Sequence, residues 1–166
     1  MQRINWFPDP NITGTAKPVA GNNTRIEYPV VNHRNWLRAT STATGDNYAQ
    51  YILAGSQLPP AGSYHVHTVA YAQVPGAAFV VFVHVGDSYS EVCRVPVGDG
   101  QTVTVDRTIT IPSNTDQMLV RISLDPNTVG AKGMMSDILI ERADTYDTAV
   151  GGGLPGFFTG DTMPLA

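Results

Sequence analysis

A twelve-residue stretch, QTVTVDRTITIP at 101–112, alternates apolar and polar side chains almost without interruption. Successive side chains of a β-strand point to opposite faces of its sheet. Val103, Val105, Ile109 and Ile111 therefore share one face, and the threonines between them share the other. The stretch predicts a strand with one face in a core and the other in solvent.

Other segments repeat this pattern between clusters of turn residues. The segments at 117–124 and 133–142 alternate in the same way, and in the second of them Met134, Ile138 and Ile140 are expected to share a face. The segment AAFVVFVHV is apolar on both faces, which is typical of a strand covered on both sides. No stretch has a helical period over helical length.

About eight or nine strands separated by regular turn signals predict an antiparallel β-sandwich. Periodicity alone leaves an immunoglobulin-like sandwich and a jelly roll open. A chain of 166 residues and 17.8 kDa fits one domain with a useful core. We expect a single domain over 1–166, with an irregular N-terminal strap at 1–23, the sandwich at 24–142, and a C-terminal tail at 143–166 that packs back on it.

Composition excludes several classes of partner. Ten Lys and Arg residues and a net charge of −4 provide no basic stripe, so we expect no nucleic-acid binding. No apolar run reaches the length of a membrane span or a secretion signal, so we expect no membrane insertion and synthesis in a cytoplasm. A single cysteine, Cys93, excludes an internal disulfide and reads as a small buried residue.

The polar residues do not form a catalytic pattern. The carboxylates suited to a glycosidase are scattered over turns and strand ends, and no nucleophile motif accompanies the serines. We expect no enzyme. His65, His67 and His84 could share a sheet face, but no cysteine or carboxylate joins them at zinc-ligand spacing, so we interpret them as outward polar positions.

Three segments resemble parts of carbohydrate-binding-module-like jelly rolls. They are INWFPDPNITG at 4–14, LPPAGSYHVHTVAYAQ at 58–73 and DILIERADTYD at 137–147. They are similar to the N-terminal segment, an early strand and the closing strand of that family. An aromatic residue of the family's N-terminal segment is replaced here by Asn11 and Ile12. The resemblance implies a jelly-roll fold.

The segment GFFTGDTMP at 156–164 resembles the ending of minor tail proteins from long-tailed bacteriophages of actinobacteria, with Thr159 in place of the usual aspartate. This resemblance implies a minor tail or tail-tip protein, assembled in the host cytoplasm and exposed on the virion after lysis. Its implied partners are other tail proteins, further copies of the chain, with a trimer favoured, and host cell-wall glycan. The alternatives are a free-standing carbohydrate-binding module and a capsid decoration protein of the same fold.

Four side chains are candidates for glycan binding, because sugars stack on aromatic rings while polar neighbours read their hydroxyl groups. Trp36 and Arg38 alternate with apolar residues and so point away from the core. Tyr48 and Tyr71 are each followed two residues later by a glutamine. Alternatively, these aromatic residues pack under loops or against a neighbouring subunit.

Two further expectations concern the end of the chain. In many carbohydrate-binding jelly rolls an aspartate matching Asp137 helps to hold a structural calcium, and backbone carbonyls can complete such a site. The alternative is an aspartate bonded to nearby backbone amides. Phe157 and Phe158 are expected to anchor the tail on the sandwich, with a turn at Gly160 and Asp161.

Overall fold

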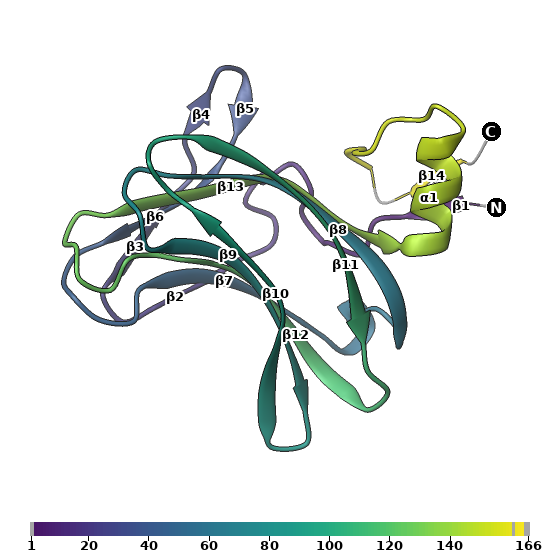
Figure 1. Cartoon of the computed structure of the whole chain (residues 1–166), viewed down its shortest axis with the longest axis horizontal. Coiled ribbons are helices and arrows are strands. Elements are labelled where there is room, and N and C mark those ends of the chain that lie inside the picture. Colours follow the sequence, from purple (N-terminus) through teal and green to yellow (C-terminus); the bar gives the residue numbers. More distant parts are fainter. Residues whose placement is uncertain (1, 161, 165–166) are drawn as a thin grey trace.

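A computed structural model of the chain describes residues 2–160 and 162–164, and two five-stranded antiparallel sheets dominate it (Figure 1). We name the sheets after their middle strands. In order across the sheet, the β12 sheet contains β10 (Ser88–Val97), β9 (Ala77–Val85), β12 (Thr115–Ser123), β7 (Tyr48–Ala54) and β2 (Val19–Ala20). The β13 sheet contains β11 (Thr102–Ile111), β8 (Gly62–Ala72), β13 (Lys132–Arg142), β6 (Leu37–Ser41) and β3 (Thr24–Glu27).

The chain passes repeatedly between the two sheets. From β6 to β13 each strand lies in the sheet opposite its predecessor, except that β9 and β10 form a hairpin within the β12 sheet. This order of crossing is that of a jelly roll. It resolves the choice that periodicity left open, and the prediction of an antiparallel jelly-roll sandwich is confirmed.

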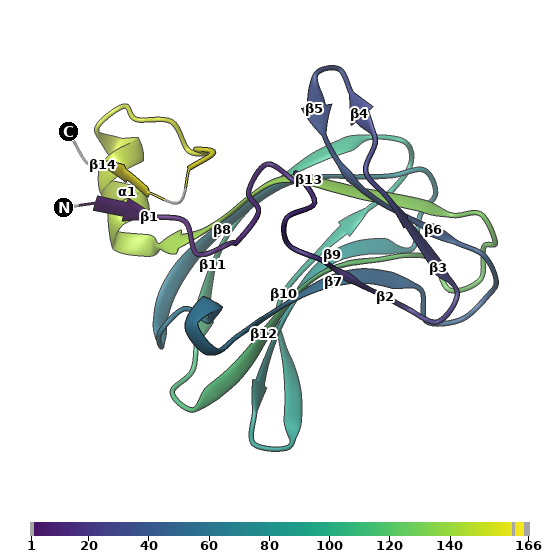
Figure 2. The same cartoon turned by 180° about the vertical axis from the view of Figure 1, so that it is seen from behind.

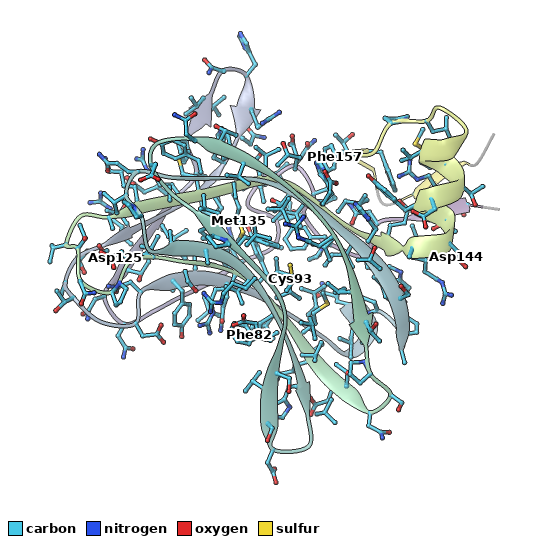
Figure 3. The ribbon with its side chains drawn as sticks, viewed as in Figure 1. Phe82, Cys93, Asp125, Met135, Asp144 and Phe157 are labelled. Carbon is cyan, nitrogen blue, oxygen red and sulfur yellow. The ribbon has the colours of Figure 1, made fainter. Side chains whose placement is uncertain are left out.

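The core lies between the sheets and follows the predicted alternation. Val105, Ile109 and Ile111 are buried in β11, while the threonines of that strand are exposed. Met135 and Cys93 lie near the middle of the molecule in Figure 3, and both belong to the same buried cluster. Full burial of a valine, leucine, isoleucine, phenylalanine or methionine side chain contributes about 1.5–3 kcal/mol to the stability of the folded state.

A β-bulge in β13 overturns one prediction. The register against β8 shifts between Ser136 and Leu139, and Asp137 has a φ of 51°. The extra residue reverses the alternation, so Met135 shares the inward face with Ile138 and Ile140, and Met134 points outward. The expectation that Met134 shares their face is wrong, because period-two reasoning assumes an uninterrupted strand.

Both ends of the chain meet in a cap at one end of the sandwich, at the right in Figure 1. There β1 (Gln2–Ile4) pairs with β14 (Thr162–Pro164), beside helix α1 (Ala143–Gly151). Sequence reasoning missed this helix because nine residues are too few to show a helical period. Only Thr145 and Ala149 of the helix are buried, one turn apart on the same side.

Three smaller elements complete the fold. Strands β4 (Val30–Val31) and β5 (Arg34–Asn35) form a hairpin that projects from the body, as Figures 1 and 2 show. A 3-10 helix, η1, spans Gly55–Gln57. Within the described residues, no helix has the length and apolar character needed to cross a membrane.

Candidate functional site

The outward side of the β12 sheet is ordered in rows, because β7, β12, β9 and β10 are in register there. Side chains in a row are direct cross-strand neighbours on one face. From β7 to β10 the rows are Gln50, Arg121, Val80 and Arg94; then Ile52, Leu119, Phe82 and Glu91; then Ala54, Gln117, His84 and Tyr89. Strand β7, the β9–β10 hairpin and strand β12, three separate parts of the sequence, thus build one surface.

Arg121 lies on β12, between β7 and β9, and is held on three sides. Its Nε and Nη2 atoms donate to Oε1 of Gln50 at 2.9 and 2.7 Å. Its guanidinium carbon lies 3.9 Å from the ring centre of Tyr48 and 4.9 Å from that of Phe82. Tyr48 and Phe82 come from the two neighbouring strands, so the cation is fixed between two aromatic rings.

The charge of Arg121 has no close counter-ion in the part of the chain that the structure describes. No carboxylate there lies within 4.0 Å of it, whereas Arg94 in the same row pairs with Glu91 at 2.8 Å. Burial lowers the pKa of the Arg121 guanidinium, and Asp46 acts against this from a greater distance. Arginine nevertheless stays charged at neutral pH.

A groove of about 290 Å³ opens beside this cation, and we call it the Arg121 groove. Its lining residues are Gln50, Phe82, Tyr89, Leu119 and Arg121. Tyr89 is 53% exposed, and its hydroxyl donates to Oε1 of Gln117 at 2.9 Å. The groove therefore combines accessible ring surface with fixed polar groups, the combination that binds sugars.

The four predicted glycan-binding residues do not lie together. Tyr48 lies beside the Arg121 groove, whereas Arg38 and Tyr71 belong to the outward side of the β13 sheet. Trp36, which directly precedes β6, lies on that same side. Arg38 is paired there with Glu27, to which its Nε and Nη2 donate at 3.1 and 2.8 Å.

Trp36 and Tyr71 line a cavity of about 530 Å³ beneath the β4–β5 hairpin, together with Arg34 and Met134. Trp36 points away from the intersheet core, as expected, but it is only 7% exposed. It offers a ligand little open ring surface. This cavity is larger than the Arg121 groove, but its tryptophan is buried, whereas Tyr89 of the groove is exposed.

Asp137 lies at the β13 bulge, and its Oδ2 is 3.2 Å from Nε of Arg34. A guanidinium next to this carboxylate repels a second cation, so these surroundings do not fit calcium well. No group of three or more His, Cys, Asp or Glu side chains within the described ranges could hold a metal ion. The calcium site stays a prediction, which a calcium titration of the melting temperature would test.

The histidines lie outward and pair with aspartates. Asp106 Oδ1 is 2.8 Å from His67 Nδ1 and 3.1 Å from His65 Nε2. His65 also stacks on Tyr146 of α1, with ring centres 3.5 Å apart. His65 and His67 therefore help to pack the cap against β8, whereas His84 of β9 lies 2.6 Å from Asp116 on the other sheet.

The two terminal phenylalanines occupy different environments. Phe158 is 9% exposed and lies 4.7 Å from the Arg3 guanidinium. Phe157, labelled in Figure 3 on the loop after α1, is half-buried with its ring centre 6.0 Å from that of His67. Asp161 of the expected turn lies outside the described residues.

Sequence reasoning missed Arg121, Phe82 and Tyr89. One signal was present: Arg121 is the only charged residue within MLVRIS, where the alternation of the strand places it outward between Val120 and Ile122. Phe82 gave no such signal, because the residues of its strand from Ala77 to Val83 are apolar on both faces. The register that brings these three side chains together depends on strand order, which no local pattern encodes.

No protein-family model and no curated protein sequence matches the chain. Solved structures do match. The C-terminal family 22 carbohydrate-binding module of Clostridium thermocellum Xyn10B superposes with a TM-score of 0.65 and 17% identity, over 85% of this chain and 96% of that one.

Two further structures resemble the chain. The CBM22-1 xylan-binding domain of Paenibacillus barcinonensis Xyn10C has a TM-score of 0.61 and 12% identity, over 85% of this chain and 92% of that one. TmCBM61, solved in complex with β-1,4-galactotriose, has a TM-score of 0.57 and 12% identity, over 83% and 98%. The chain therefore has the jelly-roll β-sandwich fold that these carbohydrate-binding modules share.

Proposed function

We propose that this protein binds a polysaccharide through the Arg121 groove. The observation that carries the proposal is a guanidinium fixed between Tyr48 and Phe82 on an open sheet face. A fixed cation and accessible rings bind the two parts of a sugar: rings pack against its C–H faces, and N–H groups donate to its oxygens. The carbohydrate-binding-module fold supports this reading.

The dimensions of the face suit a chain of sugars more than a single one. Its rows cross four strands, spaced about 4.8 Å apart, so the surface is about 14 Å wide. One structurally similar domain is a xylan-binding domain, and another was solved with β-1,4-galactotriose. Xylan and β-1,4-galactan are therefore the first polysaccharides to test.

Affinity electrophoresis against a polysaccharide panel tests the proposal. Tyr89→Ala and Phe82→Ala each remove a ring from the groove and should weaken binding about three- to tenfold. Tyr71→Ala is the matched control, because it removes a tyrosine from the cavity of the opposite sheet. Folded protein that binds none of the polysaccharides contradicts the proposal. If binding is lost only in Tyr71→Ala, the binding site is instead the cavity lined by Trp36 and Tyr71.

We propose binding without cleavage. Glycosidases need two carboxyl groups facing the bond that they break. On this face Glu91 is engaged by Arg94, at 2.8 Å to Oε1 and 2.9 Å to Oε2. A bound polysaccharide incubated with the protein should release no new reducing ends, and their appearance would refute this part.

We further propose that binding serves a bacteriophage particle, as a minor tail or tail-tip component that adheres to host cell-wall glycan. The resemblance of the segment at 156–164 supports this assignment. Immunogold labelling of purified particles would show tail label under this proposal and head label for a capsid decoration protein. Light scattering would test the expected trimer, and a monomer at high concentration would favour a free-standing module.

A further inference from the structure

Arg121 has one hydrogen-bonding edge engaged and one open. Gln50 Oε1 accepts hydrogen bonds from both Nε and Nη2, so the edge of the guanidinium that these two nitrogens form is occupied. Nη1 donates to no acceptor in the part of the chain that the structure describes. The edge formed by Nη1 and Nη2 is therefore available to a ligand, and Arg121 itself lines the groove.

The two aromatic contacts hold this open edge in place. Tyr48 and Phe82 flank the guanidinium from strands on either side of β12, and Gln50 limits its rotation in the plane. A planar, preorganised guanidinium edge matches the two oxygens of a carboxylate, which can accept two parallel N–H bonds. Little side-chain entropy is lost when an anion binds such a group.

Within the described residues, the charge of Arg121 is the one in this groove that has no ion-pair partner, although the whole chain carries a net charge of −4. Arg94 in the same row is neutralised by Glu91, and the Asp116 carboxylate on this face lies 2.6 Å from His84. The carboxylate that acts on Arg121, Asp46, lies beyond ion-pair distance. Partial burial raises the cost of leaving the cation without a counter-ion, so a bound anion would gain more here than on open surface.

We propose that the Arg121 groove selects acidic polysaccharides, with the carboxylate of a uronic acid unit accepting N–H groups from the open edge of Arg121. The inference rests on the proposed glycan binding and names the class of glycan. The sugar that bears the carboxylate packs against the groove's aromatic side chains. The planar fork of one guanidinium matches the two oxygens of a carboxylate and balances its single negative charge.

The test compares one polymer in two forms: a xylan that bears glucuronic acid, and the same xylan after chemical reduction of its carboxyl groups. We expect the wild-type protein to bind the acidic form about tenfold more tightly. The difference should shrink as sodium chloride is raised from about 0.02 to 0.5 M, because salt screens the ion pair.

Two variants assign the effect to its residue. Arg121→Gln should bind both forms with equal affinity, near that of wild type for the reduced xylan. The double variant Arg94→Gln with Glu91→Gln, the matched control on the same face, should keep the preference because it removes a cation together with its counter-ion. Circular dichroism and melting temperature establish that each variant is folded.

The outcomes separate the two proposals. Equal binding of both xylans by the wild type overturns the acidic preference and leaves glycan binding standing. A preference that survives Arg121→Gln, or an equal loss of both xylans in that variant, also overturns it. Failure of folded wild type to bind either xylan or any other polysaccharide overturns both. Tighter binding to a phosphate-bearing wall polymer than to the acidic xylan would overturn the assignment to a carboxylate.

Discussion

Arg3 and Glu141 are 138 positions apart in the sequence and form an ion pair in which both side chains are fully buried, with Nη2 2.7 Å from Oε2. A second bond, from Nη1 to the carbonyl of Pro155 at 2.6 Å, ties the same arginine to the C-terminal segment. One side chain thus joins the first strand, the last long strand and the tail.

Glu141→Gln should lower the free energy of unfolding by about 3–5 kcal/mol, because it leaves the Arg3 cation buried without a counter-ion. Chemical denaturation measures the loss. The double variant Arg3→Met with Glu141→Leu should lose less than the single variant, since it removes both charges. A single-variant loss below about 1 kcal/mol would show that the pair is solvated in solution.

Removal of residues 154–166 should lower stability by about 2–4 kcal/mol, because it exposes surface now covered by Phe158 and removes the Pro155 acceptor of Arg3. Thermal denaturation compares the chain ending at Gly153 with the full chain. An unchanged melting temperature would indicate that the two phenylalanines face a partner subunit instead.

Gly133→Ala should destabilise the sandwich by about 1–3 kcal/mol through overpacking. A Cβ at this position would lie 2.6 Å from Cδ2 of Leu124 and 3.0 Å from Cγ1 of Ile122, inside the core. Gly151→Ala is the control, since a Cβ there meets no atom within 4 Å and alanine favours the helix. Equal melting temperatures for both variants would contradict the close approach.

Asp9 should give the protein an acid-sensitive contribution to stability. Burial alone would raise the pKa of this carboxyl, but bonds from Thr13 and from the backbone N–H of Gly14 outweigh it, and the pKa lies below 3.8. A lowered pKa in the folded state means that the contribution is present above the unfolded value and is lost as pH falls through the folded value.

Denaturation of wild type and Asp9→Asn between pH 6 and pH 2 tests this prediction. The asparagine variant should be less stable at neutral pH, since its amide places a donor where an acceptor is needed, and its stability should fall less at low pH. Parallel pH profiles for the two proteins would show that Asp9 contributes nothing through its charge.

Local patterns predicted the strands because burial on one face imposes a period of two, as in β11. They failed at Asp137, because one inserted residue exchanges the inward and outward faces of β13. They also failed at α1, because this short helix is stabilised by packing on the sandwich more than by a sequence period of its own. Propensity and period describe neighbours in sequence, and these two features depend on neighbours in space.

For the candidate site too, local patterns identified some residues, and only the three-dimensional fold identified the others. Tyr48 was identified from the glutamine two residues later, which is a local pattern, but Arg121 and Phe82 lie on strands that only the jelly-roll crossing order places near it. Trp36 and Tyr71 were grouped with Tyr48 by residue type, yet they belong to the other sheet. Residue type indicates what a side chain can bind, and topology decides which side chains meet.

The pairing of β1 with β14 has a mechanical consequence. Gln2 lies opposite Pro164, and Ile4 lies opposite Thr162, so the outer ends of β1 and β14 lie side by side. A force that pulls those ends apart would separate the two strands one residue pair at a time. The first strong interaction to resist it would be the buried ion pair of Arg3 with Glu141. We expect single-molecule stretching between the ends to release the cap at low force, before the sheets yield.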